Sequence, residues 1–296
     1  MKNIENFQEL IDITRNKKSI SLVFQELESF MLEKEISELR KIMANHLENM
    51  KDAIKQGLKS PQLSESGMSG MDSYKILTRY DKQSDRLPCN KLFGKIISYA
   101  IATMEENQRM GRVVACPTAG SCGVVPAIIA AYSEEMNIEL EKQIDSMFIA
   151  GGIGKIIAQR MPLAGAVAGC QAEGGVASAM AAAAIVNMMG GNNNQVINAA
   201  ALALKNIMGL ACDPIAGLVE VPCIKRNAFL SIHAVTASEM ALSGIESYVP
   251  IDEVVDAMIQ VGKLMSPLIK ETGEGGLAVT KTALELNKKL ANLWDY

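Results

Sequence analysis

The hydrophobic and polar positions along the chain follow a helical period through most of its length. From Ser21 to about Leu58, apolar residues recur at helical spacing among Glu and Lys, which predicts one long amphipathic helix with Ser21 as its N-cap. Residues 90–110 show the same period, and Gly111 is expected to end this second helix. The pattern therefore predicts an all-α fold, mainly helical, with at most a few short strands.

A segment of unusual composition is expected at the centre of this fold. Residues 163–191 consist mostly of Ala and Gly, and such small side chains let neighbouring backbones approach closely. One further predicted helix follows Cys122 and runs through Ala131, and residues 138–158 contain a helical piece that is broken at Gly151–Gly154. The remaining predicted helices are residues 195–208, 225–243, 253–265 and 279–293. Asp252 and Thr280 are the predicted N-caps of the last two.

Two stretches are predicted to be loops. Residues 59–72 are rich in Ser, Gly and Pro and show no helical period, and residues 272–276 are mostly Gly. We expect the first loop to join an N-terminal helical segment, residues 1–62, to the main domain, residues 63–296.

Composition and charge exclude several classes of protein. Hydrophobic residues make up 49% of the chain but aromatic residues only 4%, which favours packed helices over a β-sandwich. The net charge is −4 and no basic stripe is present, so no nucleic-acid partner is expected. The most apolar run, residues 176–190, is shorter than the roughly 20 residues of a membrane helix. We therefore expect a soluble, cytoplasmic protein without a membrane partner, whose thiols stay reduced.

Three of the six cysteines lie in unlike contexts: Gly-Cys170-Gln-Ala-Glu, Ala-Cys212-Asp-Pro and Val-Pro-Cys223-Ile-Lys-Arg-Asn. In a reduced compartment each is a core side chain, a metal ligand or a reactive thiol, and an ordinary cytosolic cysteine is most often a core side chain. Our interpretation is that folding brings these three thiols together around an iron–sulfur cluster. A zinc site with one further ligand is the alternative, which the lack of any C-x₂-C pair disfavours.

Such a cluster would support the elimination of water. Three cysteine ligands leave one iron of a four-iron cluster open, and an open iron is a Lewis acid for a substrate hydroxyl. The reaction also needs a base for the neighbouring C–H proton. His233 lies on a predicted helix, where a core or surface role is at least as expected, so the sequence offers no good candidate for this base.

Two loops are candidates for substrate binding. The loop from Cys116 to Cys122 precedes a helix, whose free N–H groups and positive dipole end suit an anion, although an ordinary connection is the alternative. The run Ser66–Gly70 gives a weaker signal, because successive backbone N–H groups in turns also bind carboxylates. The candidate substrate contacts in these loops are Ser69, Gly70, Thr118, Gly120 and Ser121. Cys116 and Cys122 are interpreted as core or pocket-lining thiols.

Three segments resemble the catalytic domain of bacterial iron–sulfur L-serine dehydratases, and in particular the α subunit of the two-chain form. They are CPTAGSCGVVPA (116–127), GCQAEGGVASAM (169–180) and MGLACDPIAGLVEVPCIKRN (208–227). The resemblance runs from about Ser66 to the C-terminus. It implies a largely helical catalytic domain that converts L-serine to pyruvate and ammonia on a [4Fe–4S] cluster, without pyridoxal phosphate.

The resemblance also implies that Cys170, Cys212 and Cys223 are the cluster ligands. Beside them, Lys225 and Arg226 are expected to neutralise cluster charge or to clamp the substrate carboxylate, and Asp213 and Glu173 to hydrogen-bond near the ligands. The residues that we predict to be catalytic are Lys225, Thr118 and Ser121, and Arg226 joins the predicted substrate contacts.

The same resemblance implies a partner chain. Single-chain members carry a further N-terminal domain that contributes to the active site, and the residues before Ser66 leave no room for it here. We therefore expect a hetero-oligomer with a separate β subunit. Some single-chain relatives use a C-terminal cysteine to occupy the free iron, but this sequence ends in Leu293-Trp-Asp-Tyr296. The alternatives are a related lyase for L-threonine or L-cysteine and a non-catalytic, metal-stabilised helical subunit.

Overall fold

The chain is mainly helical in the residues that the computed structural model describes, which are 3–15, 18–59, 61–82 and 87–294. In these ranges β-type pairing is confined to an isolated bridge between Cys212 and Lys270, so the predicted all-α fold is confirmed. The α-helices are α1 (Phe7–Thr14), α2 (Ile20–Leu32), α3 (Ile36–Lys59), α4 (Asp72–Lys82), α5 (Lys91–Gln108), α6 (Val124–Met136), α7 (Leu140–Arg160), α8 (Gly165–Ala168), α9 (Cys170–Met188), α10 (Asn193–Lys205), α11 (Cys223–Leu242), α12 (Ile251–Leu264) and α13 (Lys281–Trp294). The 3₁₀ helices are η1 (Ala119–Ser121), η2 (Ile215–Gly217), η3 (Pro267–Ile269) and η4 (Gly276–Val279).

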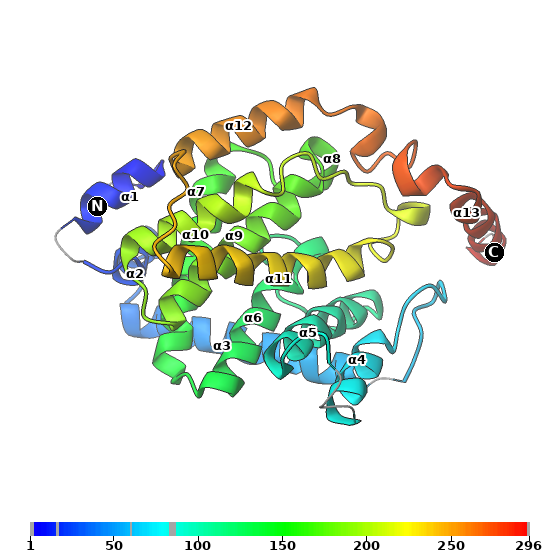
Figure 1. Cartoon of the computed structure of the whole chain (residues 1–296), viewed down its shortest axis with the longest axis horizontal. Helices are drawn as coiled ribbons and strands as arrows, with labels where there is room; N and C mark the ends of the chain where they lie inside the picture. Colours follow the sequence, from blue (N-terminus) through cyan, green and yellow to red (C-terminus); the bar gives the residue numbers. More distant parts are fainter. Residues whose placement is uncertain (1–2, 16–17, 60, 83–86, 295–296) are drawn as a thin grey trace.

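Helix α9 lies at the centre of the molecule and packs against α7, α10 and α11 (Figure 1). All of its residues except Glu173 and Asn187 are buried. A Cβ atom at Gly174 would overlap Leu230 on α11, so the small residues do allow close helix packing. The predicted central helix is confirmed, but it begins at Cys170, because Gly169 adopts a φ of +74° and separates it from α8.

The predicted helix over residues 21–58 is wrong in one respect, because it consists of two helices. Glu33 adopts a left-handed conformation with a φ of 53° and ends α2, and α3 starts at Ile36. The N-cap of α2 is Ser19, whose hydroxyl accepts a hydrogen bond from the Leu22 N–H at 3.2 Å. Apolar positions continue across the break, which is why the period alone did not reveal it.

The predicted break at Gly151–Gly154 is also wrong, because α7 runs through it without interruption. A Cβ atom at Gly152 would overlap Phe24 of α2, and one at Gly154 would lie 2.8 Å from the Met180 sulfur of α9. These glycines therefore allow close helix packing and do not end the helix.

The two predicted C-terminal N-caps have different outcomes. Thr280 accepts a hydrogen bond from the Ala283 N–H at 3.4 Å at the start of α13. Asp252 instead lies within α12, and its carboxylate accepts from the backbone N–H groups of Phe7 and Gln8 at 3.1 and 2.9 Å, so it binds the first turn of α1. Asp295 and Tyr296 lie outside the described residues.

One cluster of buried hydrophobic side chains extends from Ile4 to Met258. It includes side chains from α1 to α3 as well as from the later helices, so this core crosses the predicted domain boundary at residues 62 and 63, which stays a prediction. None of the helices in the described part of the chain is long and apolar enough to cross a membrane.

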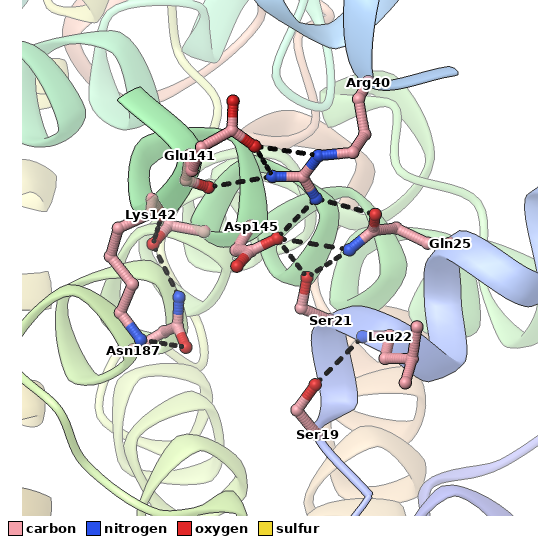
Figure 2. Close-up of polar contacts among 10 residues, drawn as sticks. Ser19, Ser21, Leu22, Gln25, Arg40, Glu141, Lys142, Asp145 and Asn187 are labelled. Atoms are coloured by element: carbon pink, nitrogen blue, oxygen red, sulfur yellow. Dashed lines mark hydrogen bonds and ion pairs between the residues drawn. The ribbon is translucent and has the colours of Figure 1, made fainter. Parts of the chain in front are cut away.

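Arg40 on α3 joins three helices through a polar network (Figure 2). Its Nη1 donates to Gln25 Oε1 and Asp145 Oδ1, both at 2.7 Å, and its Nη2 donates to Glu141 Oε2 at 2.6 Å. Ser21 donates its hydroxyl to the same Asp145 oxygen at 3.1 Å. Because Gln25 and Ser21 belong to α2 and the two acids to α7, the guanidinium holds α2 and α3 against α7.

We expect the substitution Arg40→Met to lower the free energy of unfolding by about 1–2 kcal/mol, because Asp145 loses a charged hydrogen-bond donor at a half-buried site. Urea denaturation measures this loss. The control is Arg15→Met, whose ion pair with Asp12 is 70% and 49% exposed and should change stability by less than about 0.5 kcal/mol. Equal losses in the two variants would contradict a fastening role for Arg40.

Candidate active site

The three cysteines predicted as ligands are brought together from three segments. Cys170 is the first residue of α9, Cys223 is the first residue of α11, and Cys212 lies in the turn before η2. All three are buried. Cys170 and Cys212 are near enough to influence each other's ionisation, and Cys223 is near enough to influence that of Cys212.

The thiols differ in their ease of ionisation. The neighbouring Cys212 thiol lowers the pKa of Cys170; burial opposes this effect, and the positive charge of Arg226 adds to it. The neighbouring Cys170, together with burial, raises the pKa of Cys212. Burial raises the pKa of Cys223 to about 12. The site thus favours one thiolate, at Cys170, where the N-terminus of α9 and a guanidinium meet.

Arg226 connects Cys170 to the turn that follows Cys212. Its Nη1 lies 3.6 Å from the Cys170 sulfur and donates to the Ala211 carbonyl oxygen at 2.8 Å, while its Nη2 donates to Asp213 Oδ1 at 2.8 Å. The other Asp213 oxygen accepts from the Leu277 N–H at 2.8 Å. The guanidinium is therefore fixed beside a thiol by a buried carboxylate, and its charge-neutralising role stays a prediction.

The segment after α12 closes over Cys212. The Cys212 N–H donates to the Ile269 carbonyl at 2.8 Å, and the Glu271 N–H donates to the Cys212 carbonyl at 2.6 Å. Glu271 adopts a φ of 63°, and one of its carboxylate oxygens lies near Gly165, as do the Cys212 sulfur and a Glu173 oxygen. This contribution of residues 269–271 had no signal in the sequence.

The loop from Cys116 to Cys122 meets the first turn of α9 through Glu173. Thr118 donates its hydroxyl to the Glu173 carboxylate, Gly120 lies against the same carboxylate, and the Ser121 hydroxyl lies 3.2 Å from that of Thr118. Burial raises the pKa of Glu173, and the hydrogen bond from Thr118 opposes that effect. The carboxylate that this loop binds in the structure is thus one of the chain's own, three residues after Cys170.

Asn227 holds the same loop from the side of α11. Its amide donates to the Gly120 carbonyl at 2.9 Å and to the Cys223 carbonyl at 3.0 Å, and its oxygen accepts from the Gly123 N–H at 3.0 Å. The side chain is buried, and it ties Thr118, Gly120 and Ser121 to the helix that carries Cys223. Asn227 is part of the third family-like segment, but its role required the structure.

The remaining predicted residues point elsewhere. Lys225 forms an ion pair with Asp72 of α4 at 2.8 Å. His233 is half-buried, and its Nε2 atom lies 2.8 Å from the Ala203 carbonyl of α10. Ser69, next to Gly70, donates its hydroxyl to the buried carboxylate of Glu220 at 2.6 Å.

Within the described residues, no three His, Cys, Asp or Glu side chains are close enough to ligate a single metal ion.

Comparison with known proteins covers nearly the whole chain. The family described as serine dehydratase alpha chain matches residues 12–278. The chain belongs to this family. Within it, the chain is 45% identical over 288 residues to a probable L-serine dehydratase, alpha chain, of Bacillus subtilis, which is 96% of this chain and 94% of that protein. It is 38% identical over 288 residues to the L-serine dehydratase, alpha chain, of Peptoniphilus asaccharolyticus, covering 95% and 96% of the two chains.

A longer member of the L-serine dehydratases matches only in part. The chain is 42% identical over 183 residues to L-serine dehydratase TdcG of Escherichia coli, which is 61% of this chain but 40% of that protein. The serine dehydratase alpha chain family match starts well before Ser66, so it is longer than the resemblance in the three segments suggested.

Proposed function

We propose that the chain is the α subunit of an L-serine ammonia-lyase that converts L-serine to pyruvate and ammonia together with a separate β subunit. The observation that carries the proposal is the meeting of Cys170, Cys212, Cys223 and Arg226 at the starts of α9 and α11. The names of the α-chain relatives and their end-to-end match support both the reaction and the β subunit.

We further propose that Cys170, Cys212 and Cys223 hold a [4Fe–4S] cluster. The donor set fits, because the three thiols are buried and because two helix N-termini and Arg226 favour negative charge there. Such a cluster supplies a Lewis-acidic iron with an open position for the substrate hydroxyl.

The chain's own residues then bind and orient the substrate. Thr118, Gly120 and Ser121 line the start of η1 and are held by Glu173 and Asn227, so their polar atoms have fixed positions beside the thiols. Arg226, fixed by Asp213, holds positive charge next to Cys170. The ion pair of Lys225 with Asp72 favours a role in holding α4 over the predicted catalytic role.

Anaerobic co-purification of the chain with a serine dehydratase β chain tests the proposal. We expect iron and inorganic sulfide in the complex, pyruvate formation from L-serine, and loss of labile iron and activity in air. A complex without iron, or activity that survives air, would favour a closed metal site or a structural subunit. Comparing the elimination rates for L-serine, L-threonine and L-cysteine decides among the related lyases.

A further inference from the structure

Glu220 is a buried carboxylate that three serine hydroxyls surround. The residue is 3% exposed, and Ser64, Ser66 and Ser69 donate to its oxygens at 2.7, 2.8 and 2.6 Å. All three donors belong to residues 64–70, here called the serine loop. Because a buried carboxylate is costly unless its oxygens accept hydrogen bonds, the serine loop is what allows Glu220 to be buried.

The backbone of the serine loop is folded around this carboxylate. The Ser64 N–H donates to the Ser69 carbonyl at 2.9 Å and closes the loop. Gly70 leaves it with a φ of +124°, and a Cβ atom there would lie 2.6 Å from the Gln62 carbonyl oxygen. The three hydroxyls therefore point inward, toward Glu220, so the contact with a substrate carboxylate that is predicted for this loop falls to its backbone N–H groups.

Glu220 also belongs to the turn that ends at Cys223. Its carbonyl accepts the Ile224 N–H at 2.9 Å in the first turn of α11, and the neighbouring Val221 carbonyl accepts the Ile215 N–H at 2.9 Å. The backbone of Glu220 is thus fixed by the ligand-bearing turn, while its side chain holds the serine loop.

We propose that Glu220 is a positioning residue that fastens the serine loop, with the predicted substrate contacts Ser69 and Gly70, to the turn that carries Cys212 and Cys223. This inference rests on the proposed function. The Glu220 carboxylate accepts hydrogen bonds from three serines of the loop, and the backbone of Glu220 is fixed in the turn between Cys212 and Cys223. The position of the serine loop therefore depends on the position of these two cysteines.

The substitution Glu220→Ala in the anaerobic complex with the β chain tests this proposal. We expect backbone hydrogen exchange in residues 64–70 to become at least about tenfold faster, because the loop loses its common acceptor. The KM for L-serine should rise about tenfold with kcat changed by less than about threefold, the pattern of a lost binding contact. Iron content should stay at the level of the unaltered complex, and Glu220→Gln should give intermediate values.

Glu65→Ala is the matched control. It also removes a carboxylate from the serine loop, but Glu65 is exposed. It should match the unaltered complex in hydrogen exchange and KM. If Glu220→Ala does not fold, Ser66→Ala removes one of the three donors and should show the same changes at a smaller size. Unchanged exchange in the serine loop, or faster exchange with an unchanged KM, would overturn the positioning role. If the unaltered complex makes no pyruvate, the proposed function fails, while the exchange comparison still decides whether Glu220 fastens the loop.

Discussion

Replacing Cys212 with serine should abolish both iron binding and pyruvate formation. Serine has nearly the size of cysteine, so the hydrogen bonds of the Cys212 backbone with Ile269 and Glu271 can persist and the fold should survive. The hydroxyl, however, is a poor iron ligand, which leaves two thiols on separate helices to hold the cluster. We expect activity below about 0.1% of that of the unaltered complex, a loss of more than about 4 kcal/mol of transition-state stabilisation.

Iron and sulfide analysis after anaerobic reconstitution measures this effect, with pyruvate formation as the second readout. Two controls separate ligation from the loss of any thiol. Cys89→Ser changes an exposed cysteine, and Cys122→Ala removes a buried thiol that contacts the Met104 sulfur at 3.6 Å. Both variants should keep their iron, although Cys122→Ala should lose about 1 kcal/mol of stability. Full iron content in Cys212→Ser would refute the proposed ligand set.

The helices were largely predictable from the sequence, because most of them have one apolar face or are apolar throughout. The errors came where glycine and helix ends are ambiguous. Gly151–Gly154 has the composition of a break, but Phe24 and Met180 require small residues at Gly152 and Gly154 within a continuous helix. Glu33 ends α2 because its backbone is left-handed, and an exposed glutamate gives no sign of this conformation in the sequence.

The candidate site was predictable in its cysteines but not in its internal carboxylates. The family resemblance implied a shared site at Cys170, Cys212 and Cys223, and in the structure Cys170 and Cys212 are near enough to influence each other's ionisation. Two loops were predicted to bind an external anion, yet one binds Glu173 and the other binds Glu220. Loop composition indicates that a carboxylate is favoured, whereas its source depends on contacts between segments far apart in the sequence.

Replacing Arg226 with glutamine should have the second largest effect, on both stability and the site. The Asp213 side chain is only 7% exposed. Of the contacts described above, only the hydrogen bond from the Leu277 N–H remains to the Asp213 carboxylate when the guanidinium is removed. Removing one partner of a buried ion pair costs about 3–5 kcal/mol. We therefore expect the free energy of unfolding of the cluster-free chain to fall by this amount. In the reconstituted complex, kcat/KM should fall by about 10–100-fold, because Cys170 loses its neighbouring positive charge.

Urea denaturation under reducing conditions measures the loss in the free energy of unfolding. The double variant Arg226→Gln/Asp213→Asn separates this loss of stability from the effect on activity. Because asparagine keeps an oxygen for the Leu277 N–H but carries no charge, the double variant should regain most of the lost stability. It should not regain kcat/KM, since the positive charge beside Cys170 is still missing. The control Arg112→Gln, at an exposed position, should change stability by less than about 0.5 kcal/mol. A double variant as unstable as Arg226→Gln alone would show that packing of the guanidinium stem, and not the buried charge of Asp213, sets the loss.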